Sequence, residues 1–84
     1  MIIDLLSLVQ LNAIKIQKEI YNHYDKHDLE IEGLMLNEFE VDLTLIMEFE
    51  EIDIKEVIVF IDGVTVTPEI INQNEAEKFI NSIF

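Results

Sequence analysis

Residues 38–50 read EFEVDLTLIMEFE, and this stretch decides the fold. Apolar and polar side chains alternate along nearly all of it, which is the period of a β-strand whose two faces meet different surroundings. One face carries Phe39, Val41, Leu43, Leu45, Met47 and Phe49. The pattern predicts a long strand with this face on a core and the other in solvent, as in an antiparallel sheet covered on one side.

The segment before this strand alternates as well, on both sides of Gly33. A glycine inside a strand is typical of a β-bulge, and a bulge would return Leu34 and Leu36 to the core face. Asn37 is a residue that suits a turn. We therefore expect a strand at 29–36 that turns back to pair with 38–50.

A further hairpin is predicted downstream, after a charged connection at 51–55. The β-branched run 57–61 and the segment 64–67 flank Asp62-Gly63, and Asp-Gly suits a type I′ turn because both central residues need a positive φ. Such a turn places Val59 opposite Val66 and puts Ile58 and Phe60 on the outer side of the sheet.

Helices are predicted at both ends of the chain. Apolar residues recur at spacings of three and four over residues 2–24, which indicates one long helix. Thr67-Pro68 predicts a short helical turn, and Asn74 followed by Glu77 suggests a capping box that starts a final helix at about 75–84. Leu8 and Leu11 lie outside the apolar stripe of the first helix. Either the C-terminal segment or a loop covers them, or they form a surface for self-association.

Together these elements predict a single α+β domain over residues 1–84. Its order is α-β-β-β-β-α, and it forms a two-layer sandwich in which a long N-terminal helix and a short C-terminal helix cover one face of a four-stranded antiparallel sheet.

The composition excludes several classes of protein. The chain has 84 residues, 18 acidic side chains, five lysines and no arginine, which gives a net charge of -13, and half of its residues are hydrophobic. The apolar half argues against a disordered acidic tail, and the charge argues against binding nucleic acid or an anionic membrane. The absence of cysteine removes disulfides and thiol chemistry. The apolar N-terminus lacks a basic region and a cleavage site, so we expect a cytoplasmic protein.

Residues that could support catalysis or bind a cofactor are sparse. Ser7 and Ser82 lie in predicted helices without a nucleophile motif, and the two glycines are too far apart for a phosphate loop. His23 and His27 form an HxxxH pair, which indicates either a solvated helix end or, with a further ligand, a metal site. We predict that the protein is not an enzyme and that it has no cofactor and no metal.

The acidic residues are concentrated in one third of the chain. Residues 28–56 hold eleven of them against one lysine, so this segment carries -10 of the total -13. Glu38, Glu40 and Asp42 are expected to form one row on the outer sheet face, and Glu48 and Glu50 another. Two interpretations remain open: a surface that only keeps the protein soluble, or an anionic array that occupies a cationic groove.

Three apolar residues, Ile46, Ile58 and Phe60, are expected on the same outer face as the acids. Apolar anchors inside a charged rim have the layout of a protein interface. The leading hypothesis is a small inhibitor that blocks a basic, nucleic-acid-binding surface of a partner protein, as phage or mobile-element anti-defence proteins do. The alternatives are a homo-oligomeric assembly subunit, a homodimer included, and an acidic antitoxin or immunity protein that neutralises a basic toxin.

Overall fold

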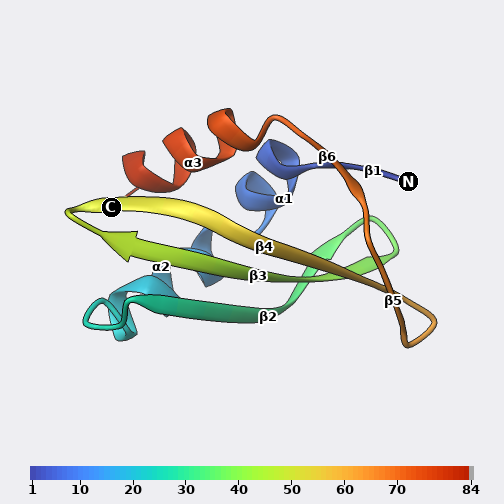
Figure 1. Cartoon of the computed structure of the whole chain (residues 1–84), viewed down its shortest axis with the longest axis horizontal. Coiled ribbons are helices and arrows are strands. Elements are labelled where there is room, and N and C mark those ends of the chain that lie inside the picture. The colour runs from blue at the N-terminus through green and yellow to red at the C-terminus, as the bar shows by residue number, and fades with distance from the viewer. Residues whose placement is uncertain (84) are drawn as a thin grey trace.

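The computed structural model describes residues 1–83, and Phe84, at the end of the predicted final helix, lies outside them. The elements follow one another in Figure 1 as β1 (Ile2–Asp4), α1 (Leu5–Leu11), α2 (Ala13–Asn22), β2 (Asp28–Leu36), β3 (Phe39–Glu48), β4 (Glu51–Ile61), β5 (Val64–Val66), β6 (Glu69–Ile71) and α3 (Gln73–Ser82).

The predicted α+β class with a four-stranded antiparallel sheet is confirmed. The strand order of that sheet is β2-β3-β4-β5. The predicted element order was wrong, because β1 and β6 form an additional two-stranded parallel pair and the described residues contain three helices. Each of these extra strands has three residues, which is too short to show a period in the sequence.

The central strand β3 follows its sequence period. Val41, Leu43 and Leu45 are buried, while the alternate residues point to the opposite face. The predicted bulge in β2 is also confirmed. Glu32 and Gly33 together face Asp42, and the parity shift brings Leu34 and Leu36 into the core. Gly33 has a φ of 72°, which only glycine adopts at little cost.

The predicted charged connection at 51–55 was wrong, since those residues begin β4. Ile52 and Ile54 are buried between charged neighbours. Lys55 is an extra residue relative to β3, where the register steps from Thr44 opposite Glu56 to Leu45 opposite Ile54. This bulge joins two segments of opposite parity, which is why the sequence period seemed to break there.

The prediction of one long N-terminal helix was also wrong. Its first residues form β1, and Asn12 divides the remaining residues into α1 and α2. The Asn12 side chain donates to the Leu8 carbonyl at 2.8 Å and so competes with the helical hydrogen bond at that position. The break lets α1 and α2 bury different faces. Asp4 ends β1 and caps α1, accepting from the Leu6 and Ser7 amides at 3.0 and 3.3 Å.

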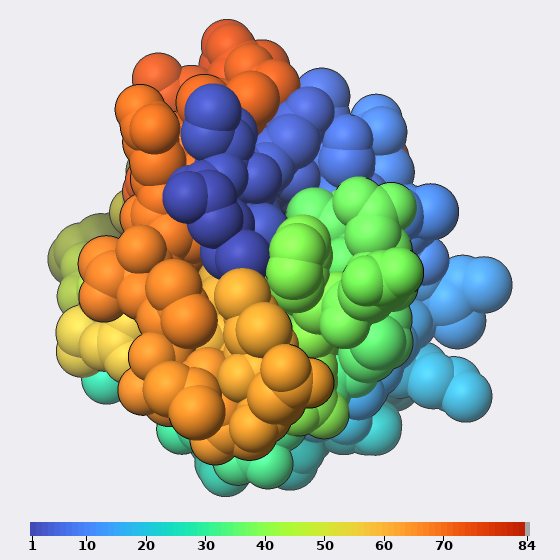
Figure 2. Space-filling view, turned by 90° about the vertical axis from the view of Figure 1, so that its right-hand side faces the viewer, coloured from blue at the N-terminus to red at the C-terminus, as the bar shows by residue number. Residues whose placement is uncertain are grey.

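The helical turn predicted at Thr67-Pro68 is replaced by β6, which lies beside β1. The Glu69 amide donates to the Met1 carbonyl at 2.8 Å, and Figure 2 shows the blue N-terminal residues between the orange β6 segment and the green β2–β3 turn. Helix α3 then begins two residues earlier than predicted, with Asn72 rather than Asn74 as its N-cap. The predicted capping box does not form, because the Glu77 carboxylate accepts from the Ile54 amide instead.

One hydrophobic core lies between the four-stranded sheet and the helices. Leu5, Leu8 and Val9 of α1 and Ile16 and Ile20 of α2 pack with the inner residues of the sheet and with Ala76 and Ile80 of α3. None of these helices covers the other face of the sheet in the part of the chain that the structure describes. Within residues 1–83, no helix is long and apolar enough to cross a membrane.

Candidate functional site

The open face of the sheet is lined mainly by carboxylates. The register places acidic residues on all three long strands: Asp28, Glu30 and Glu32 on β2, Glu40, Asp42 and Glu48 on β3, and Glu51, Asp53 and Glu56 on β4. Glu48 and Glu51 lie directly opposite each other. Like charges in such positions destabilise a sheet.

Three of the five predicted acidic site residues lie on this face and two do not. Glu40, Asp42 and Glu48 point outward from β3. Glu38 lies in the β2–β3 turn and Glu50 in the β3–β4 turn, both exposed. Each predicted row therefore ends in a turn, because β3 spans Phe39–Glu48 and is shorter at both ends than the alternating stretch 38–50.

The three predicted apolar anchors do not form one centre. Ile58 and Phe60 are half-buried neighbours on the outer side of β4, opposite Asp42 and Glu40. Ile46 lies between Asp28 and Asp53, four residues further along β3 than Asp42. At about 3.3 Å per residue that separation is roughly 13 Å. The face thus holds two separate apolar sites among its carboxylates.

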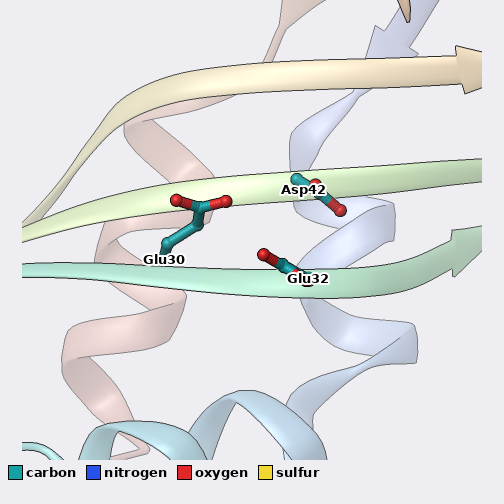
Figure 3. Close-up of side chains that lie close together, drawn as sticks. All are labelled: Glu30, Glu32 and Asp42. Atoms are coloured by element: carbon teal, nitrogen blue, oxygen red, sulfur yellow. The ribbon is translucent and has the colours of Figure 1, made fainter. Parts of the chain in front are cut away.

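The bulge in β2 assembles a carboxylate cluster that sequence reasoning missed. Oxygens of Glu30, Glu32 and Asp42 lie within 4.8 Å of one another in front of the sheet, with the helices behind it (Figure 3). Asp42 also accepts a hydrogen bond from the Gly33 amide at 2.9 Å. The negative charge of Glu32 raises the pKa of Glu30, and burial adds to that shift. Gly33 was the available sequence signal, because a bulge there sets Glu32 opposite Asp42.

Such oxygen donors suit hard cations such as Ca²⁺ or Mg²⁺. The cluster stands on an open face, and the three carboxylates supply only part of a six- to eight-oxygen shell. We assign no ion to it.

The HxxxH pair is divided between two structures. Helix α2 ends at Asn22, and His23 then forms its C-cap and lies 3.7 Å from the Glu19 carboxylate. His27 lies beyond the helix and bonds to Glu48 through Nε2 and to Asp28 through Nδ1. Its hydrogen bond to Glu48 raises the pKa of His27, and the bond to Asp28 acts in the same direction. The imidazoles therefore do not share a helix face.

Asp28 carries a second contact, with the Lys55 ammonium at 3.3 Å. That hydrogen bond lowers the pKa of Asp28. Asp28 thus pairs with both His27 and Lys55, and His27 also pairs with Glu48, so these four side chains form one charge network at this end of the sheet.

The two residues predicted as an oligomer interface have separate environments. Leu8 is fully buried in the core, where α1 packs against α3. Leu11 is 69% exposed, and Ile14 beside it is 76% exposed. Together with Lys15 and Lys18, they line a shallow hollow at the junction of α1 and α2.

Sequence reasoning missed one more surface, at the β3–β4 turn. Phe49 was expected on the core face, but it lies in the turn and is 97% exposed. It borders an open hollow whose apolar lining comes from Ile20, Tyr24, Met47 and Ile52. The alternation of residues 38–50 continues through the turn, so the period concealed the reversal of the chain.

Comparison of the chain with protein-family models, with curated proteins and with solved structures finds no match. Any function assigned to the chain must therefore come from its own residues.

Proposed function

We propose that the protein is a small, non-enzymatic inhibitor that places its acidic sheet face on a basic, nucleic-acid-binding surface of a partner protein. Phage and mobile-element anti-defence proteins of this class act by such obstruction. The observation that carries the proposal is the gathering of carboxylates from β2, β3 and β4 on the one sheet face that the helices leave open. A rigid sheet holds them in fixed rows.

The face is costly to maintain, which favours a use for it. Glu48 opposes Glu51 directly, and the carboxylates of Glu30, Glu32 and Asp42 lie close together. Both arrangements oppose folding through repulsion. A basic partner would relieve that repulsion on binding, and the field would speed its encounter.

The test is affinity capture with the immobilised chain at rising salt, followed by displacement of a labelled DNA duplex from the captured protein. We expect a basic protein that elutes as salt rises and loses its DNA to the chain. The variant E40K/D42K/E48K should capture nothing. Its control, D25K/E69K/E75K, changes the net charge equally at exposed positions off the sheet face and should still bind. Capture that survives in the first variant, or fails equally in both, contradicts the proposal.

An acidic antitoxin or immunity protein would use the same face against a basic toxin. The identity of the captured protein separates the two, because a toxin has an activity that the chain should neutralise.

A second function, homo-oligomeric assembly, is favoured by the exposed Leu11 and Ile14. Leu8 cannot contribute to it without unfolding, because it is buried. Light scattering after size-exclusion chromatography tests this alternative. It predicts an oligomer that L11S/I14S converts to monomer.

A further inference from the structure

The β3–β4 turn displays an aromatic side chain in an unfavourable backbone conformation. Phe49 and Glu50 have φ values of 50° and 64°, a region that Asn and Gly favour and that bulky residues rarely occupy. The Phe49 ring gains nothing from the core in return, since it is 97% exposed. The fold therefore does not explain why this position holds phenylalanine.

Phe49 stands at the edge of the hollow at the β3–β4 turn. Met47 and Ile52 line it from β3 and β4, and Ile20 and Tyr24 line it from the end of α2 and the residues after it. Tyr24 is 78% exposed. An exposed aromatic pair beside apolar walls is the composition of an interface anchor, because aromatic residues dominate binding hot spots.

Within residues 1–83, every charged residue that lines the hollow is acidic. Glu48, Glu50 and Glu51 surround it. Glu48 is paired with His27, whereas Glu50 and Glu51 form no ion pair within residues 1–83. A second hollow shares Glu50 and Glu51 with the first. Asp53, Glu77 and Lys78 also line it, so its four carboxylates face one ammonium group and its charge stays negative.

We propose that the tip of the molecule, meaning the β3–β4 turn with Phe49, Glu50, Glu51 and the adjoining hollow, docks a basic segment of a partner protein. In that segment an aliphatic or aromatic side chain lies between lysines or arginines. The apolar side chain would fill the hollow against Phe49 and Tyr24, and the basic residues would reach Glu50 and Glu51. A second copy of this chain is a poor occupant, because each copy carries a charge of -13 and the rim would face like charge. The inference rests on the proposed function in that the partner is basic. It uses the end of the sheet at the β3–β4 turn, which shares only Glu48 and Glu51 with the acidic face.

The test uses a fluorescein-labelled peptide, acetyl-KKLFKKLLKK-amide, and a control peptide in which serine replaces every leucine and phenylalanine. Both peptides carry the same charge, so attraction to an acidic protein alone binds them equally. We expect the apolar peptide to bind about tenfold more tightly, which is the size of a modest hot-spot contribution. Amide shifts in ¹⁵N spectra should centre on Tyr24, Met47, Phe49 and Ile52.

Variants then identify the side chains responsible. Phe49→Ala should abolish the preference for the apolar peptide, and Phe49→Asn should do the same while retaining a residue suited to the turn. The matched control is Val64→Ala, which truncates a residue 64% exposed at the other hairpin turn and should bind as the parent does. E50Q/E51Q should weaken both peptides more than E69Q/E75Q.

Equal binding of the two peptides, or an unchanged preference in both Phe49 variants, overturns the inference. Shifts that centre on Glu40 and Asp42 also overturn it, because the peptide would then occupy the sheet face. That last outcome supports the proposed function, so the two ideas fail separately. The opposite result is also possible: the peptide binds at the tip, and E40K/D42K/E48K displaces DNA as well as the parent does. In that case the inference about the tip stands and the sheet-face mechanism is rejected.

Discussion

The side-chain amide of Asn81 pairs with the backbone of Ile52 as a neighbouring strand would. Its Oδ1 accepts from the Ile52 amide and its Nδ2 donates to the Ile52 carbonyl, both at 2.9 Å. Glu77 accepts from the Ile54 amide at 2.7 Å, and Gln73 donates to the Ile54 carbonyl at 3.1 Å. Three side chains spaced four residues apart on α3 thus close the edge of β4 that β5 is too short to reach. An unpaired edge of this kind would invite pairing with other chains.

Replacing Asn81 with alanine should therefore destabilise the fold. Both polar groups of Ile52 lose their partner on a part-buried edge, which we expect to lower the free energy of unfolding by about 1–3 kcal/mol. Urea denaturation measures the change. The control is Asn74→Ala, an exposed asparagine on the same helix, which should change stability by less than about 0.5 kcal/mol. Equal losses in the two variants would contradict the edge-closing role.

The contacts between α3 and the edge of β4 could not be predicted from the sequence. The spacing of Gln73, Glu77 and Asn81 was visible, but polar residues at helical spacing ordinarily mark a solvated face. Glu77 was assigned to a capping box for the same reason, since only local partners can be inferred from spacing. Their partner is a strand edge about 20 to 30 residues away, which depends on how short β5 turns out to be.

A second prediction concerns the β3–β4 turn. Replacing Phe49-Glu50 by Asn-Gly should raise the free energy of unfolding by about 1 kcal/mol, because both positions have a positive φ and the replaced ring makes no core contact. Thermal denaturation measures it. The reciprocal control converts Asp62-Gly63, the other turn with two positive φ values, to Phe-Glu and should lower stability. A turn that is destabilised by Asn-Gly would contradict the assigned geometry. If the tip binds a partner, the stabilised variant should also lose that binding.

The third prediction concerns Gly33 at the β2 bulge. A Cβ there would lie 3.5 Å from the Lys15 ammonium and 3.8 Å from a Glu40 carboxylate oxygen, which is ordinary contact. The cost of Gly33→Ala is therefore that of the positive φ, about 1 kcal/mol. Gly33→Asn should cost less, because asparagine tolerates this conformation better. Chemical denaturation of both variants checks the order, and an alanine variant as stable as the parent would contradict it.

Strong periodic signals predicted the middle of the fold, and weak or non-local ones concealed its ends. The alternation of β3, the bulge at Gly33 and the Asp62-Gly63 turn are each determined by a few adjacent residues. Strands β1 and β6 exist only as a pair, so neither has a signature of its own. The acidic composition of the site was predictable, but the cluster of Glu30, Glu32 and Asp42 and the exposure of Phe49 required the register.

A fourth prediction follows from the repulsion around Glu30. Its pKa is raised in the folded chain above the ordinary value of 4.5, chiefly by the charge of Glu32. The folded state therefore binds this proton more tightly than the unfolded state, so stability is lost as pH rises through that window. Glu30→Gln should raise the Tm at pH 7, with a gain that fades near pH 4 and at high salt.

The matched control for Glu30→Gln is Glu38→Gln, which removes one charge from the exposed β2–β3 turn outside the cluster. It changes the net charge of the chain equally. A larger Tm gain for Glu30 than for Glu38 identifies the cluster as the source of the repulsion. Equal gains would assign the effect to net charge alone.

The last prediction concerns His27, which bonds to both Glu48 and Asp28 at the border of the acidic face. Its pKa is raised above the ordinary 6.5, first by the hydrogen bond to Glu48. The imidazolium is therefore favoured in the folded chain, and its stabilising contribution is complete below pH 6.5 and is lost as pH rises through the folded pKa. The Tm of the parent protein should fall as pH rises over that range, and His27→Gln should make the Tm depend less on pH. His23→Gln is the control, because His23 lies at the C-cap of α2 and pairs with Glu19 rather than with Glu48 or Asp28. It should leave the pH dependence that His27 causes in place. Titration of the His27 ring by NMR gives the pKa directly, and a value at or below that of an unfolded peptide would contradict the pairing.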